Sequence, residues 1–193
     1  MKYAIFYFSP CGGTKSVADI ISKELGDAPM QEITTPSMNV ALDNETLAFF
    51  CFPVYGGRIP KPMYDRMDII KGNNTPCVPV AVYGNRAVDD ALLEMSDLAA
   101  KQGFVTVAGC SMIAPHSIDP SFGAGRPDAS DKAKLIDFLK KLKEKDSFAE
   151  VQTSIEARLF MLGFIHELLF AIYVPEQLAA PTIPAPLKKK SSE

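Results

Sequence analysis

The loop at positions 9–14, Ser-Pro-Cys-Gly-Gly-Thr, is rich in groups that can bind an anion. It joins an apolar run to a segment with helical spacing, so a helix begins in this loop. N–H groups at a helix N-terminus are unpaired and lie at the positive end of the helix dipole. Ser9 and Thr14 add hydroxyls that can hydrogen-bond phosphate oxygens. The loop therefore predicts an anion site, and an ordinary glycine-rich turn is the alternative interpretation.

Several known anion-binding patterns do not fit this loop. The GxGxxG pattern lacks its third glycine, and the P-loop pattern fails because Thr14 separates Gly13 from Lys15. A cysteine-phosphatase loop starting at Cys11 would need an arginine six positions on, where Val17 stands. A phospho-accepting receiver domain would need acidic residues where the first predicted strand ends. What remains is S-x-[T/C]-G-x-T, which resembles the loop that holds the FMN phosphate in the flavodoxin-like family.

The loop at positions 53–60, PVYGGRIP, offers groups that suit the ring of a flavin. Gly56 and Gly57 allow positive φ and a reoriented carbonyl, which can accept a hydrogen bond from flavin N5. Tyr55 can stack on the isoalloxazine ring, and Arg58 can neutralise the phosphate or the reduced flavin. The alternative interpretation is a tight turn with a partly exposed tyrosine.

The loop at positions 84–90 follows the next predicted strand. Gly84 and Asn85 offer backbone and amide hydrogen bonds to the pyrimidine edge of a flavin. The sequence leaves the role of Arg86 open. For Asp89 and Asp90 we favour a place at the start of the following helix, where carboxylates interact well with the helix dipole.

The loop at positions 115–128 contains His116, one of two histidines in the chain. His116 is expected to contact flavin or substrate, or to donate protons during reduction. An incidental loop histidine is the alternative. Arg126 can equally close the loop by pairing with Asp128 or Asp131.

These loops must be brought together by the fold of the chain, and the spacing of the apolar residues predicts that fold. Strands are predicted at 3–8, 30–33 (weak), 46–52, 77–83 and 104–108 with extension toward 113, and helices at 17–25, 62–70, 92–103 and 130–142. This alternation predicts an α/β fold: a doubly wound, five-stranded parallel sheet with helices on both faces. The resemblance implies the strand order 2-1-3-4-5 known for flavodoxins, with the ligand beyond the carboxyl ends of the strands.

Taken together, the four loops resemble the flavodoxin modules of anaerobic bacterial flavodoxin–ferredoxin fusion proteins over about residues 1–146. Those proteins continue into a ferredoxin module with two cysteine-rich runs, whereas no cysteine follows Cys110 here. Electrons are therefore expected from a separate redox protein or a soluble reductant. The candidate FMN-binding residues are Ser9, Pro10, Cys11, Gly12, Gly13, Thr14, Pro53, Val54, Tyr55, Gly56, Gly57, Arg58, Tyr83, Gly84, Asn85, Arg86 and His116.

Composition excludes several other classes. The chain has 193 residues, a net charge of −3 and a pI near 5.5, which disfavours nucleic acid as the main partner. The four cysteines, at 11, 51, 77 and 110, form no close pair, so no metal or iron–sulfur site is predicted. The N-terminal apolar run is too short for a signal peptide. A cytoplasmic protein with reduced thiols is expected.

The predicted domains are a flavodoxin-like unit over 1–148, an apolar helical segment over 149–175 and a Pro/Lys-rich tail over 176–193. Residues 155–174 are apolar enough to approach a membrane span, but their four titratable side chains favour packing on the domain or on a second copy in a homodimer. Membrane contact is the less favoured interpretation.

The expected function is an FMN-binding electron-transfer protein that shuttles electrons between redox partners. The first alternative is an NAD(P)H-dependent flavin or quinone reductase. The second is a cofactor-free interaction module that dimerises through the C-terminal helix.

Overall fold

The computed structural model describes residues 1–35 and 39–144. The apolar segment predicted at 155–174, the tail at 176–193 and the domain boundary at 148 lie outside these residues. The elements in chain order are β1 (Lys2–Tyr7), α1 (Gly13–Glu24), β2 (Met30–Glu32), β3 (Val40–Leu42), β4 (Thr46–Pro53), α2 (Pro62–Met67), β5 (Ile70–Gly72), β6 (Thr75–Tyr83), α3 (Ala91–Lys101), β7 (Phe104–Thr106), β8 (Cys110–Ile113) and α4 (Ala129–Lys143).

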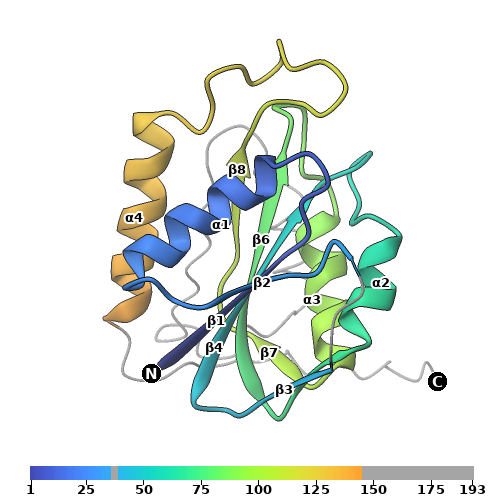
Figure 1. The fold of residues 1–193 in the computed structure, drawn as a ribbon, viewed down its shortest axis with the longest axis vertical. Coiled ribbons are helices and arrows are strands. Elements are labelled where there is room, and N and C mark those ends of the chain that lie inside the picture. Colours follow the sequence, from blue (N-terminus) through green and yellow to red (C-terminus); the bar gives the residue numbers. More distant parts are fainter. Residues whose placement is uncertain (36–38, 145–193) are drawn as a thin grey trace, which may run out of the picture.

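The main sheet is parallel and has the order β2-β1-β4-β6-β7, with β8 also pairing with β6 (Figure 1). Since β7 and β8 lie in succession along the same edge of β6, the sheet has five strand positions in the order 2-1-3-4-5. The predicted fold class and strand order are confirmed. Each connection between neighbouring parallel strands carries a helix across one face of the sheet, as a parallel pair requires.

Helices cover both faces of the sheet and form two separate cores. Figure 1 shows α1 and α4 on one side and α2 and α3 on the other. Successive side chains of a strand point to opposite faces, so in β4 Phe49 and Cys51 join the α1/α4 core while Phe50 and Phe52 join the α2/α3 core. This explains the continuous apolar run in β4, which is buried on both faces.

The fifth strand position is occupied by two short strands, β7 and β8. The sequence had instead indicated one strand over 104–108 that extends toward 113. Cys77 of β6 lies opposite Thr106, but Val80 lies opposite Cys110, so this edge contains one extra residue. The N–H of Val107 donates to the Cys77 carbonyl at 3.0 Å. Pro79 is the next residue of β6 facing this edge, and it has no N–H to offer. The break coincides with that missing donor.

Helix α2 is shorter than the helix predicted over 62–70, and this prediction was wrong at its end. The helix stops at Met67, and Ile70 instead pairs with Val40 in a small parallel sheet of β3 and β5 that the sequence did not indicate. Met63, Met67 and Ile70 have helical spacing, and all three are fully buried in the same core. Ile70, however, is buried as part of strand β5 and not of the helix. An apolar period alone cannot separate these two arrangements.

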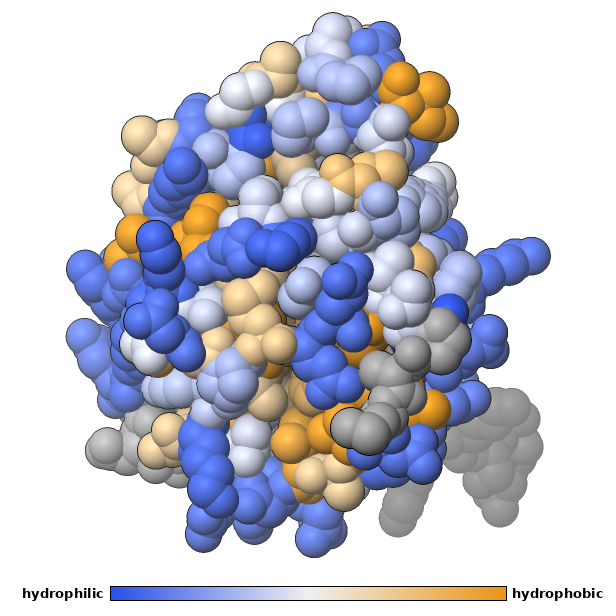
Figure 2. Space-filling model, viewed as in Figure 1, coloured by the Kyte–Doolittle hydropathy of each residue, from blue (hydrophilic) through white to orange (hydrophobic). Residues whose placement is uncertain are grey.

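The surface in Figure 2 is mostly hydrophilic, with apolar residues in small groups. One such group lies at the top, over the β8–α4 loop, where the exposed fractions of Ile118 and Phe122 are 88% and 61%. Within residues 1–35 and 39–144, the chain forms no helix of the length and apolar character needed to cross a membrane.

Candidate functional site

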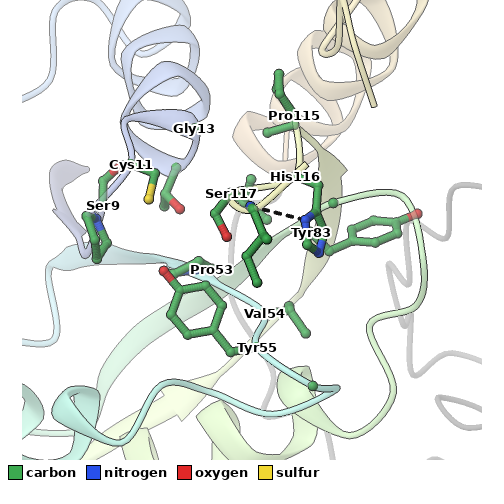
Figure 3. Close-up of a pocket in the computed structure, with 17 residues that line it drawn as sticks. Ser9, Cys11, Gly13, Pro53, Val54, Tyr55, Tyr83, Pro115, His116 and Ser117 are labelled. Atoms are coloured by element: carbon green, nitrogen blue, oxygen red, sulfur yellow. Dashed lines mark hydrogen bonds between the residues drawn. The ribbon is translucent and has the colours of Figure 1, made fainter. Parts of the chain in front are cut away.

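A pocket of about 380 Å³ opens where the carboxyl ends of β1, β4, β6 and β8 meet (Figure 3). Each of the four strands contributes residues at its carboxyl end or in the loop after it. This is the position at which ligands bind to open α/β sheets, because the loops there converge from several strands. Its volume lies in the range of small-molecule and cofactor sites.

The β1–α1 loop presents hydrogen-bond donors to this pocket. Lys15 N–H donates to Ser9 Oγ at 2.9 Å, and Ser16 N–H donates to the Gly12 carbonyl at 3.1 Å. The N–H groups of Gly13 and Thr14 have no acceptor among the residues that the structure describes. They belong to the first turn of α1, where the helix itself supplies no partner. The loop therefore holds two unpaired amides at the positive end of a helix.

Thr14 adds a third donor to the same place. Its side chain is almost wholly buried, with an exposed fraction of 3%, yet it lines the pocket. Its hydroxyl makes no hydrogen bond to any described residue. Because Thr14 lines the pocket, this hydroxyl is available to a ligand there. Two amides and one hydroxyl at this end of α1 fit the oxygens of a phosphate monoester.

Two glycines shape the loop. Gly12 is the N-cap of α1 and has φ 83°, in the left-handed region that glycine adopts at little cost. At Gly13 an added Cβ would lie 3.2 Å from Ala114 Cβ, so the start of α1 packs tightly against the end of β8. At the other end of the loop, Ser9 N–H donates to Thr34 Oγ1 at 2.8 Å. These contacts hold the donors at the pocket.

The β4–α2 loop forms a tight turn on the opposite side of the pocket. Tyr55 and Arg58 exchange backbone hydrogen bonds of 2.9 and 3.2 Å, and the intervening Gly56 and Gly57 have φ of 58° and 80°. Two successive positive φ values are typical of a type I′ turn. An added Cβ at Gly57 would lie 2.7 Å from Asp89 Cβ, so the turn also packs on the β6–α3 loop. Both positions thus favour glycine because of their positive φ, and Gly57 also has no room for a side chain.

Tyr55 lies across the mouth of the pocket. Its exposed fraction is 42%, and in Figure 3 its hydroxyl is directed toward the β1–α1 loop. Burial, followed by the nearby Cys11 thiol, raises the pKa of Tyr55. The ring is therefore placed to cover a planar group in the pocket.

Arg58 lies outside the pocket lining and points to α3. It forms ion pairs with Asp90 at 3.2 Å and Glu94 at 3.1 Å. Glu94 also accepts hydrogen bonds from Ile59 N–H, at 3.0 Å, and from the Tyr64 hydroxyl. Burial would raise the pKa of Glu94, but these hydrogen bonds and the Arg58 charge outweigh it and lower the pKa. The structure gives Arg58 the role of anchoring the turn to α3.

His116 forms the wall of the pocket beside β6. Its Nδ1 accepts backbone N–H groups from Ile118 at 3.2 Å and Asp119 at 3.3 Å, one of which is drawn in Figure 3. The neutral ring therefore carries its proton on Nε2. Asp119 in turn accepts from Ser121, and these hydrogen bonds lower the pKa of Asp119. His116 thus orders the loop in which it lies.

Tyr83 contributes to the pocket lining, but its phenol ring extends away from the β1–α1 loop in Figure 3. Burial raises the pKa of Tyr83, and the charges of Arg126 and Asp131 also act on it. Arg126 pairs with Asp131 through two side-chain hydrogen bonds and lies 3.6 Å from Asp128. Of the two partners that the sequence left open for Arg126, the structure pairs it with both.

The structure brings most of the candidate residues into one pocket. Those that line it are Ser9, Pro10, Cys11, Gly13, Thr14, Pro53, Val54, Tyr55, Gly56, Tyr83, Gly84 and His116. Those that do not line it are Gly12, Gly57, Arg58, Asn85 and Arg86. Arg86 instead lies 3.5 Å from Asp89, and Asn85 has φ 64° in the turn after β6.

Five lining residues were not among the candidates: Val82, Ala114, Pro115, Ser117 and Ile118. Four of them follow β8 directly, and their position after a predicted strand end was a usable signal. Val82 carried no such signal, because an apolar residue inside a strand is expected to be buried.

Comparison with solved structures identifies the fold. A flavodoxin from Streptococcus pneumoniae TIGR4 is similar with a TM-score of 0.52 and 19% identity, over 74% of this chain and 98% of that one. Oxidised flavodoxin 2 from Bacillus cereus is similar with a TM-score of 0.52 and 18% identity, over 75% and 99%. No protein-family model and no curated protein matches the chain. The chain therefore has a flavodoxin-like α/β fold.

Proposed function

We propose that this chain binds one FMN non-covalently in the pocket and carries electrons between redox partners. The observation that carries the proposal is the set of three donors at the start of α1: the N–H groups of Gly13 and Thr14 and the Thr14 hydroxyl, whose residue lines the pocket. Together they match the terminal phosphate of a mononucleotide. The two solved structures compared above are named flavodoxins, which supports the same ligand.

The rest of the pocket suits the remainder of that ligand. Pro53, Val54 and Ala114 provide apolar walls, and Tyr55 offers an aromatic face at the mouth. Gly56, in the turn after Tyr55, and Gly84 also line the pocket, where the lack of a side chain leaves the backbone accessible to a ligand. When bound, FMN supplies the redox chemistry. The chain's own residues bind it, orient it and limit the access of water.

The donor and acceptor of electrons are taken to be separate molecules, a redox protein or a soluble reductant. A purified FMN complex that oxidises NADH or NADPH rapidly, with free flavin or quinone as acceptor, would instead show a reductase.

The binding step is tested by titrating the purified protein with FMN and measuring the quenching of flavin fluorescence. We expect saturation at one FMN per chain and weaker binding of riboflavin, which lacks the phosphate. Thr14→Val removes one phosphate donor without changing side-chain shape, and we expect it to weaken FMN binding by about 1–3 kcal/mol.

The matched control is Thr106→Val on β7. The Thr106 hydroxyl lies 3.6 Å from Cys77 Sγ, toward the start of β6 and away from the pocket. This variant is expected to bind FMN as the parent protein does. Binding of riboflavin as tight as that of FMN, or equal affinity in the Thr14→Val variant, would contradict the assigned phosphate site.

A further inference from the structure

The four cysteines differ sharply in accessibility. Cys51, Cys77 and Cys110 are fully buried, and burial raises the pKa of the Cys51 thiol and raises those of Cys77 and Cys110 to about 12. Thiol chemistry requires an accessible thiolate, so these three are inert in the folded protein. Cys11 is exposed. It is the one thiol of the chain that a reagent in solution can reach.

Cys11 lies inside the candidate phosphate site. It lines the pocket, and in Figure 3 its Sγ points into the space between the β1–α1 loop and Tyr55. Tyr55 lines the same pocket, and its hydroxyl is directed toward the β1–α1 loop in Figure 3. A group attached to Sγ would therefore extend across the pocket.

A second observation at the same place points independently to a ligand. The Thr14 side chain is 3% exposed and lines the pocket, and its hydroxyl makes no hydrogen bond to a described residue. The unpaired N–H groups of Gly13 and Thr14 lie in the same turn. Whatever anionic group binds these donors occupies the volume next to Cys11 Sγ.

We propose that Cys11 is a modification site at which a low-molecular-weight disulfide blocks the loading of the cofactor. The proposal rests on the function proposed above. A substituent on Sγ and the phosphate arm of FMN compete for the same part of the pocket, so each weakens the binding of the other. By linkage, bound FMN must disfavour the adduct at equilibrium by the same factor by which the adduct raises the Kd for FMN.

The chemistry is thiol–disulfide exchange and needs no further oxidant. The Cys11 thiolate attacks one sulfur of the disulfide, a new S–S bond forms at Sγ, and the old S–S bond breaks. The second half leaves as a thiolate, which takes up the proton that Cys11 lost. One disulfide is consumed and one is formed, so electrons balance. An excess of a small thiol reverses the step.

The test uses the full chain without cofactor, treated with oxidised glutathione as the probe. Intact and peptide mass spectrometry are expected to show one glutathionyl group per chain, on Cys11. Fluorescence titration of this adduct is expected to give a Kd for FMN raised by about tenfold or more over the untreated protein. Dithiothreitol is expected to restore the original Kd.

Two variants make the test specific, each compared before and after treatment. Cys11→Ser is expected to form no adduct and to show no change on treatment. The double variant Cys11→Ser with Ser16→Cys places an exposed thiol on the first turn of α1 but outside the pocket lining. It is expected to form an adduct and to keep its own FMN affinity.

Different failures have different meanings. An adduct on Cys11 that leaves the Kd unchanged, an adduct on another cysteine, or no adduct at all overturns the inference and leaves the proposed function standing. An untreated protein that does not bind FMN overturns the proposed function, and this inference fails with it because no loading remains to be blocked.

Discussion

At the scale of single residues, the contact between Gly84 and His116 shapes one wall of the pocket. An added Cβ at Gly84 would lie 2.8 Å from the Cβ of His116 and even closer to its ring. His116 in turn holds the N–H groups of Ile118 and Asp119 through Nδ1. A side chain at position 84 would therefore displace the imidazole and the turn that it orders.

For Gly84→Ala we expect a loss of about 1–3 kcal/mol in the free energy of unfolding, because the added methyl overpacks a tight contact. Urea denaturation measures this loss. NMR chemical shifts of residues 116–119 should change in the same variant.

The control for this substitution is Gly109→Ala. An added Cβ there would lie 3.6 Å from the Pro79 carbonyl oxygen and 3.8 Å from Leu92, which are ordinary contacts. Equal destabilisation by the two substitutions would show that loss of glycine, and not the His116 contact, is responsible.

At the scale of elements, the start of α4 is fixed by a capping box. Asp131 N–H donates to Asp128 Oδ1, and Asp128 N–H donates to Asp131, both at 2.9 Å. The Asp131 side chain is buried, and the Arg126 guanidinium beside it lowers its pKa. One carboxylate thus joins the helix start to the loop that carries His116.

For Asp131→Asn we expect a loss of about 1–3 kcal/mol in the free energy of unfolding at neutral pH. Because the pKa of Asp131 is lower in the folded chain than in the unfolded one, its stabilisation is complete above the unfolded value. It is lost as the pH falls through the folded value. The difference between variant and parent should therefore shrink in strong acid.

Denaturation at several pH values measures this difference. The control is Asp137→Asn on the same helix, where the ion pair with Lys141 is exposed, and it should cost less than about 0.5 kcal/mol. A difference for Asp131→Asn that stays constant down to strong acid would contradict the charge-based account.

The sequence predicted the elements that are buried in a regular way. The double-sided burial of β4 and β6 produces long apolar runs, which are visible without a structure. The end of α2 was mistaken because Ile70 continues the helical spacing of Met63 and Met67 while lying in β5. The extra residue between β7 and β8, opposite Pro79, depends on pairing between two distant segments. A local sequence pattern does not contain that information.

The same limit applies to the site. Strand ends predicted which loops converge, since the carboxyl ends of parallel strands share one edge. They did not indicate that Arg58 turns to Asp90 and Glu94, because arginine suits a carboxylate as well as a phosphate. The choice between these partners depends on the packing of α3 against the turn.

At the scale of the whole molecule, the two cores and the pocket can be followed only through the described residues 1–35 and 39–144. The core of α1 and α4 ends with Leu142, and the last residue lining the pocket is Ile118. The domain boundary at 148 stays a prediction, and deletion of the residues after it tests that prediction.

For the chain ended after residue 148 we expect FMN binding equal to that of the full chain and a Tm within about 4 °C of it. Calorimetry and fluorescence titration measure the two quantities. Aggregation of the shortened chain, or loss of FMN binding, would show that the remaining residues complete the fold or the site.

The central claim is that the start of α1 holds the phosphate of FMN, and a crystal structure of the complex tests it most directly. We expect phosphate oxygens within hydrogen-bond distance of the Gly13 and Thr14 N–H groups and of the Thr14 hydroxyl, with the ring beside Tyr55. A complex in which the phosphate lies elsewhere, or crystals grown in saturating FMN that contain none in this pocket, would contradict the account.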